Sequence, residues 1–124
     1  VSWNIERGKR FDSVVATLQS DPNLRDADLV LLNEVDIGMS RSGNRNVARD
    51  LAATLRTDYL FSNSHLVLAQ GDVAERAHAG PNGLSLHGNV LLSRLPIRRW
   101  DAVVVPEWRD RFHATEKRLG EKRA

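Results

Sequence analysis

Two polar side chains lie at the ends of apolar runs that are typical of β-strands. Asn4 lies near the end of the strand-like segment 1–5, and Glu34 follows the apolar run 29–32. In open α/β sheets, ligands bind in the crevice outside the strand ends. Carboxylate and amide groups there suit a divalent cation and a phosphate, because Mg²⁺ takes oxygen ligands and commonly uses only one or two protein carboxylates. The two residues therefore predict a metal and phosphate site.

Each of these polar residues also has a structural explanation. A buried carboxylate is costly without a partner, so Glu34 needs either a cation or a salt bridge to an arginine, and spacing does not choose between them. Asn4 either orients a phosphate oxygen or satisfies loop backbone. Glu6 shares a face with Asn4 in an extended strand, where it is a second metal carboxylate or, as we favour, a solvated side chain.

Arginines surround the start of a predicted helix over about 44–55. Arg45 and Arg49 are spaced i, i+4 and would share a helical face. A helix N-terminus with nearby arginines is a plausible anion site, so Arg41 and Arg45 are the predicted phosphate-binding residues. A solvated basic face is the alternative. The histidines show no zinc-site spacing, and His87 either lines the crevice or has a structural role.

Apolar periodicity predicts the elements that hold these residues. A first helix begins at Phe11 and ends at Asp21, because the residue before a proline disfavours the helical backbone. The predicted strands are 1–5, 28–35, 59–61, 65–69, 88–93 and 97–105. The continuous apolar run of 28–35 predicts a strand covered on both faces. With a long loop over 70–86 and an irregular charged end over 107–124, the predicted class is mixed α/β.

Composition limits the kinds of function available to the chain. Its 124 residues are 41% hydrophobic and carry a net charge of +2, which fits one modest domain. The absence of cysteine excludes disulfides, zinc–thiolate sites and a cysteine nucleophile. No apolar stretch approaches the roughly 18 residues of a membrane span, and no signal peptide is visible. We expect a soluble protein, cytoplasmic rather than secreted. Because the first residue already lies in a predicted strand, we also expect residues 1–124 to be one partial domain, truncated at both ends.

Three segments together resemble the endonuclease/exonuclease/phosphatase superfamily, which has the deoxyribonuclease I-like fold. They are Ser-Trp-Asn-Ile at 2–5, Leu-Leu-Asn-Glu-Val-Asp at 31–36 and Gly-Asn-Val-Leu-Leu-Ser-Arg-Leu-Pro-Ile at 88–97. Each segment is weak alone, but the three occur in the family's order, with a helix between the first two. The resemblance covers residues 3 to about 97, and 118–120 resemble the start of the next family strand.

The resemblance implies the N-terminal half of a four-layer α/β sandwich and hydrolysis of phosphate esters with Mg²⁺, or alternatively Mn²⁺. Glu34 matches the family's glutamate metal ligand, and Asn4 matches the asparagine that organises the metal and phosphate. Glu6 falls, more loosely, where some members carry a second acidic residue. Asn89 matches a position that we assign to structural support.

Two later family motifs, a Gly-Asp-x-Asn segment and a terminal Asp-His pair, do not occur in the chain. We therefore expect these 124 residues alone to be inactive, with an exposed sheet that the missing C-terminal half or an oligomeric partner would cover. The implied substrates are nucleic acids, phospholipids or small phosphates, and Asp36 argues mildly against a DNA backbone near Glu34. The alternative is a non-catalytic module that binds nucleic acid or protein.

Overall fold

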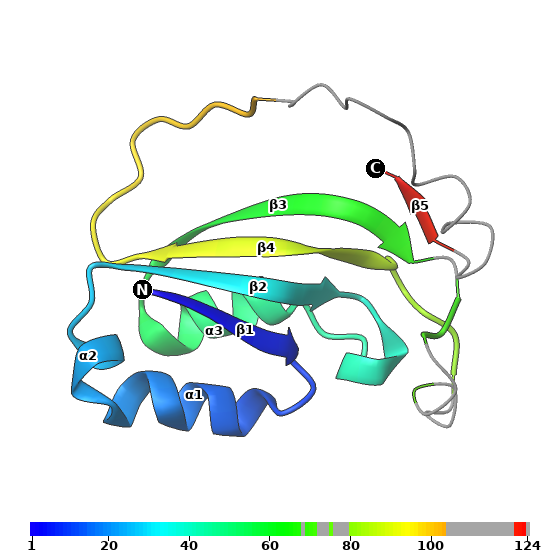
Figure 1. Ribbon diagram of the computed structural model, residues 1–124, viewed down its shortest axis with the longest axis horizontal. Coiled ribbons are helices and arrows are strands. Elements are labelled where there is room, and N and C mark those ends of the chain that lie inside the picture. Colours follow the sequence, from blue (N-terminus) through cyan, green and yellow to red (C-terminus); the bar gives the residue numbers. More distant parts are fainter. Residues whose placement is uncertain (68, 72–74, 76–79, 104–120, 124) are drawn as a thin grey trace.

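The described residues form one mixed sheet with helices on a single face (Figure 1). This computed structural model describes residues 1–67, 69–71, 75, 80–103 and 121–123. Their helical elements are α1 (Phe11–Ser20), α2 (Pro22–Arg25), the 3₁₀ turn η1 (Ser40–Ser42) and α3 (Val47–Leu55). Their strands are β1 (Ser2–Arg7), β2 (Leu29–Ile37), β3 (Asp58–Val67), β4 (Leu86–Ser93) and β5 (Glu121–Arg123). The predicted mixed α/β class is confirmed.

The sheet order is β1-β2-β4-β3-β5. Only β1 and β2 run parallel, and α1 provides the crossover between them, whereas β2, β4, β3 and β5 pair antiparallel. This order places β2, which carries Glu34, between β1 and β4. The three strands that contain the segments of the resemblance are therefore direct neighbours.

The core lies between the sheet and the two longer helices. Val14 and Leu18 of α1 and Leu51 of α3 are buried against Leu32 and Val90 of the sheet. The predicted apolar faces of both helices are thus the packed faces. α1 ends at Ser20, and Asp21, with ψ 120°, accepts a hydrogen bond from the Asn23 amide to start α2.

The face of the sheet opposite α1 and α3 carries no helix in the described part of the chain (Figure 1). The side chains of Leu29 and Leu31 are 47% and 49% exposed there. The expectation that this strand is covered on both faces was therefore wrong. Burial alternates along β2 up to residue 33, as in a sheet with one covered face.

The segment after β4 was predicted to be a further strand over 97–105, and its described part, 97–103, is not one. It leaves the sheet and passes over the open face, enclosing a cavity of about 560 Å³ with Leu31, Leu60, Leu91 and Trp100 among its lining. Residues 59–61 and 65–69 were predicted as separate strands, but β3 is continuous over Asp58–Val67. In the region predicted to be irregular, residues 121–123 form β5, and 104–120 and 124 lie outside the described residues.

Three strands are interrupted by bulges at the same level of the sheet. The pairing register shifts at 4–7 in β1, at 32–35 in β2 and at 63–65 in β3. At this level β4 contributes Gly88, which pairs with both Val35 and Asn63. A Cβ on Gly88 would lie 2.0 Å from the backbone oxygen of Ser62. The absence of a side chain at residue 88 is therefore what allows β3 to approach at its bulge.

Candidate functional site

Glu34 and Asn4 lie on neighbouring strands at the level of the bulges. Asn4 of β1 pairs with Asn33 of β2, and Glu34 is the next residue along β2. The structure therefore brings the two predicted residues to adjacent backbone positions. Their roles in metal and phosphate binding stay predictions.

Glu34 combines backbone strain with an unengaged carboxylate. Its φ is 54°, in the left-handed region that side-chain-bearing residues rarely adopt within a strand. Its side chain is half-buried, and among the described residues its carboxylate makes neither a hydrogen bond nor an ion pair. The salt bridge to an arginine, which was the structural alternative, is thus not formed with any described residue.

Asn4 is exposed, and its amide orientation is set by its own strand. Its Oδ1 accepts a hydrogen bond from the backbone amide of Glu6 at 2.9 Å. This satisfies the backbone as the structural interpretation expected, yet it turns the Nδ2 donors away from that amide. Within the described chain, Nδ2 has no hydrogen-bond partner.

Glu6 lies at the β1 bulge and not in extended strand. Its φ is 51°, so the alternation that would place it on the face of Asn4 does not continue to it. Its carboxylate is 54% exposed and forms an ion pair with Arg10 at 3.0 Å. These contacts match the solvated interpretation, and the metal-ligand role of Glu6 stays a prediction.

Arg41 lies inside the protein, with its residue only 7% exposed. Its Nε and Nη2 donate to Asp36 Oδ2 and Oδ1 at 2.7 and 2.9 Å, a two-point contact between guanidinium and carboxylate. Its Nη1 donates to Glu75 Oε2 at 3.0 Å. The predicted phosphate-binding role of Arg41 is not tested by these contacts, but they occupy both sides of its guanidinium.

The environment of Asp36 favours its ionised form. Burial would raise the pKa of the Asp36 carboxyl, but hydrogen bonds from Arg41 and His87 hold that pKa below its ordinary value. Burial would likewise lower the pKa of the Arg41 guanidinium, and the contacts with Asp36 and Glu75 raise it instead. Asp36 is fully buried. Its predicted unfavourable effect on a DNA backbone near Glu34 therefore loses its basis.

A chain of ion pairs extends from Asp36 to β1. Glu75 binds Arg41 through Oε2 and Arg7 through Oε1, the latter at 2.6 Å. His87 Nδ1 lies 2.7 Å from Asp36 Oδ1, so the structural role considered for His87 corresponds to an observed contact. We call Arg7, Asp36, Arg41, Glu75 and His87 the Arg41 network.

Sequence reasoning missed this network, although one signal was present. Asp36 is a carboxylate between the apolar residues Val35 and Ile37 of a core strand, and a carboxylate is almost never fully buried without a partner. Arg41 follows five residues later. The link through Glu75 has no comparable signal, because that residue lies in a segment without periodicity.

Arg45 and Arg49 do not share a helical face, because α3 begins at Val47 and Arg45 precedes it. The guanidinium of Arg45 lies 4.0 Å above the ring of Phe11, and its Nε lies 3.7 Å from Asp50 Oδ2. Arg49 also contacts Asp50, at 3.0 Å. The N-terminus of α3 is capped by the side chain of Asn46. In the predicted anion site, both arginines therefore already contact Asp50, and the helix N-terminus is already capped by Asn46.

Comparison with known proteins assigns the family. The family model described as "Endonuclease/Exonuclease/phosphatase family" matches residues 1–123. The chain belongs to this family. No curated protein matches the chain, and no solved structure matches it.

Membership in the endonuclease/exonuclease/phosphatase family confirms the resemblance drawn from the three segments. It supports a phosphoesterase or nuclease superfamily, and so phosphate esters as the substrate class. None of the helices in the described part of the chain is long and apolar enough to cross a membrane.

A metal site in the described part of this chain would have few protein ligands. The described residues contain no cluster of three or more His, Cys, Asp or Glu able to hold an ion. Glu34 nevertheless offers a half-buried carboxylate without a protein partner among the described residues, beside an asparagine pair. This donor set fits Mg²⁺, which retains water and substrate oxygens and needs few carboxylates.

Proposed function

We propose that this chain contributes the metal-ligating part of a divalent-metal-dependent phosphoesterase site, which hydrolyses phosphodiester or phosphomonoester bonds. The carrying observation is Glu34, a half-buried, strained glutamate whose carboxylate no described residue engages. Family membership supports the same reading. Bulges often occur next to active sites, where they re-aim a side chain. The backbone strain at Glu34 is of the kind that clusters at functional sites.

In this proposal Glu34 supplies a hard oxygen ligand to Mg²⁺, with Mn²⁺ as the alternative ion. Held by Glu34, such a cation would supply positive charge that neutralises the phosphate and favours attack by water. Asn4 contributes its Nδ2 donors, which orient a phosphate oxygen. The hydrogen bond from the Glu6 amide to Asn4 Oδ1 holds the side chain in that orientation.

We infer further that the 124 residues alone do not turn substrate over. The family's Gly-Asp-x-Asn segment and terminal Asp-His pair, which the resemblance assigns to water activation and transition-state stabilisation, do not occur in this sequence. The chain then binds cation without hydrolysis. Nucleic acids, phospholipids and small phosphates all remain within the proposed substrate class.

Cation binding tests the proposal directly. We expect the chain to bind Mn²⁺ in titrations followed by paramagnetic broadening of amide signals, with the strongest broadening near residues 33 and 34. Glu34→Gln should abolish this broadening, since it keeps the side-chain shape and removes the charge. Asp26→Asn is the control, at an exposed carboxylate outside the proposed site, and it should leave the broadening unchanged. Equal Mn²⁺ binding by wild type and Glu34→Gln would overturn the proposal.

A parallel assay tests the inactivity of the chain. Bis(p-nitrophenyl) phosphate with Mg²⁺ should give no turnover above buffer. Metal-dependent turnover that Glu34→Ala abolishes would contradict this part of the proposal while supporting the metal site.

A further inference from the structure

The Arg41 network lies next to the row of bulges on every strand that it reaches. Asp36 follows Glu34 by two residues on β2, and its neighbour across the sheet is His87 of β4. His87 directly precedes Gly88, the residue that faces the bulges of β2 and β3. Arg7 belongs to the β1 bulge itself and has a φ of 69°. The network thus includes one residue of the irregular backbone and adjoins the rest of it.

The strained backbone at the bulges requires stabilising contacts. Glu6, Arg7 and Glu34 all have positive φ values, of 51°, 69° and 54°. A side-chain-bearing residue in a sparsely populated region costs about 1–3 kcal/mol and persists only when its surroundings impose it. The alternative, regular pairing of β1 with β2, would relieve this strain. Contacts that are lost on such relaxation are therefore required.

The contacts of Arg41 meet this requirement because they join both strained strands. Its guanidinium binds Asp36 at two points, and this contact fixes the part of β2 just beyond Glu34. Through its Nη1 it binds Glu75, whose second oxygen binds Arg7 of β1. The residues Arg41, Asp36 and Glu75 are all buried. A one-residue slip of either strand would separate buried charges, which is strongly unfavourable.

We propose that Arg41 is a positioning residue: acting through Asp36 on β2 and through Glu75 and Arg7 on β1, it holds the paired bulges that place Glu34 and Asn4. This inference rests on the proposed function of Glu34 as a metal ligand. Arg41 itself touches neither cation nor substrate in this account. Its geometry, rather than its charge alone, is what matters. A lysine carries the charge as a single point and cannot reproduce a planar two-point contact.

The test uses Arg41→Lys in the full 124-residue chain. Its first readout is the backbone conformation at Glu34, which is monitored through the strong intraresidue amide–Hα NOE that a positive φ produces. Its second readout is Mn²⁺ affinity. We expect the NOE at Glu34 to weaken and Mn²⁺ affinity to fall by a factor of about 10 to 100, the usual effect of losing a residue that orients a metal ligand.

The chain provides a matched control for the loss of a two-point contact between an arginine and a carboxylate. Arg25 makes the same kind of two-point contact with Asp26, at 2.8 and 2.7 Å, but on the surface and away from the bulges. Arg25→Lys should change neither readout. Leu18→Ala controls for stability, because it removes core packing under α1 without touching the network. It should lower the free energy of unfolding and leave the NOE at Glu34 unchanged.

A second variant keeps the inference testable if Arg41→Lys does not fold. Glu75→Gln leaves the Arg41–Asp36 fork in place and removes the negative charge between Arg41 and Arg7. It should alter the backbone at Arg7 and Glu34 and lower Mn²⁺ affinity in the same direction.

The outcomes separate this inference from the proposed function. An unchanged NOE at Glu34 in Arg41→Lys, or an equal change in Leu18→Ala, overturns the positioning role. Failure of the wild-type chain to bind Mn²⁺ overturns the proposed function, and with it the purpose assigned to Arg41. Relaxed backbone together with weakened Mn²⁺ binding, absent from both controls, supports the inference.

Discussion

Glu34 has a backbone conformation that glycine would adopt without steric cost. A strained side-chain-bearing residue in a central strand lowers stability, and we propose that it is retained at position 34 because its carboxylate binds the cation. Asp36, two residues away, shows the opposite balance: its carboxylate is fully buried and engaged by Arg41 and His87. Two acidic residues on one strand thus have different surroundings, because one has partners and the other has none among the described residues.

Glu34→Gly is expected to stabilise the chain while removing cation binding. Relief of the positive φ should raise the free energy of unfolding by about 1 kcal/mol. Urea unfolding of wild type and Glu34→Gly, with Glu34→Gln as the variant that keeps the strain, measures this. A lower stability for Glu34→Gly than for Glu34→Gln would show that the backbone at residue 34 is not strained.

Asp36 should make stability depend on pH in the acidic range. Its pKa is lower in the folded protein than in the unfolded chain, so its contribution is present above the unfolded pKa of about 3.9 and is lost as pH falls through the folded value. At pH 7, Asp36→Asn should lower the free energy of unfolding by about 3–5 kcal/mol, because it leaves a buried arginine with less countercharge.

The pH signature distinguishes Asp36 from a surface carboxylate. The difference between wild type and Asp36→Asn should shrink in urea titrations below about pH 4. Asp26→Asn should show a much smaller dependence, because the hydrogen bond from Arg25 that lowers the pKa of Asp26 is exposed to solvent. A difference for Asp36→Asn that stays constant from pH 7 to pH 3 would contradict the assignment.

At the scale of elements, residue periodicity predicted the helices and the regular strands. It did not predict the bulges, where the backbone is irregular. The apolar faces of α1 and α3 and the central strands follow from residue spacing, because burial on one side imposes that spacing. The bulges do not follow from it, since Glu34 is neither glycine nor asparagine and nothing local indicates its φ. Residues 97–105 were predicted as a strand, yet the described part, 97–103, is not one. The adjacent positions of Glu34 and Asn4 follow from the regular parts of β1 and β2 and could be predicted, whereas the Arg41 network depends on a loop residue, Glu75, and could not.

Gly88 provides the test of the bulge row. Gly88→Ala should destabilise the chain by about 2 kcal/mol or more, because its Cβ would lie 2.0 Å from the Ser62 oxygen and backbone must move. Gly83→Ala is the control, since its nearest atom would lie at 3.7 Å. Chemical unfolding of both variants measures the effect. Equal stability of the two would mean that β3 does not approach β4 as described.

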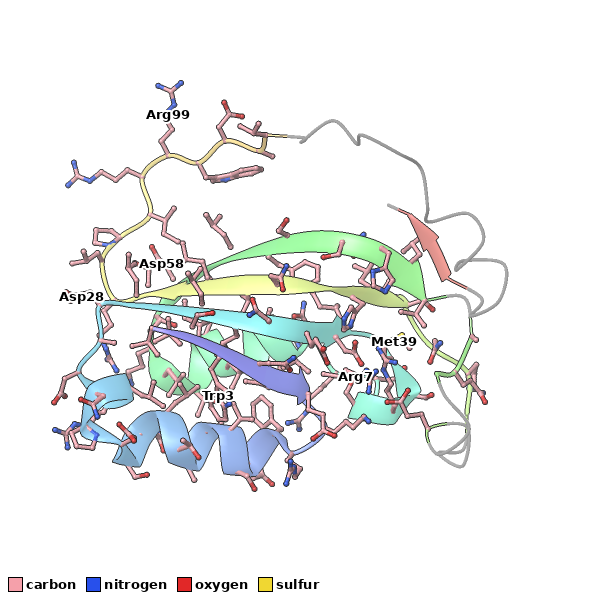
Figure 2. All side chains as sticks on the ribbon, viewed as in Figure 1. Trp3, Arg7, Asp28, Met39, Asp58 and Arg99 are labelled. Atoms are coloured by element: carbon pink, nitrogen blue, oxygen red, sulfur yellow. The ribbon has the colours of Figure 1, made fainter. Side chains whose placement is uncertain are left out.

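At the scale of the whole molecule, the unequal faces of the sheet are the main feature. In the described part of the chain, helices cover one face (Figure 1), and the other presents Leu31, Leu60 and Leu91, which line a cavity together with residues 100–103. The side chain of Arg99, just before these residues, points away from the sheet (Figure 2). Apolar surface of this kind favours association with another surface. The partner expected from the sequence, whether further chain or another subunit, stays a prediction.

The open face should make the isolated chain associate with itself. Leu31→Lys is expected to shift the chain toward monomer in sedimentation velocity runs over a range of concentrations, without loss of folding, because residue 31 is half exposed. Leu84→Lys, at a leucine that is 63% exposed outside the sheet, should leave association unchanged. A wild-type chain that is monomeric at all concentrations, or equal effects of both variants, would contradict the role of this face.

The bulge in β2 shifts the alternation of buried and exposed side chains by one residue. Before it, the even-numbered Val30 and Leu32 are buried, and beyond it the odd-numbered Val35 and Ile37 are buried against the same core. Loss of residue 34 would bring Val35 and Ile37 into step with Val30 and Leu32 in a regular strand, because side chains alternate with a period of two. The buried face of β2 would survive such a deletion, whereas the irregular backbone and the carboxylate it carries would be lost. The extra residue in β2 is therefore not required for packing of the core.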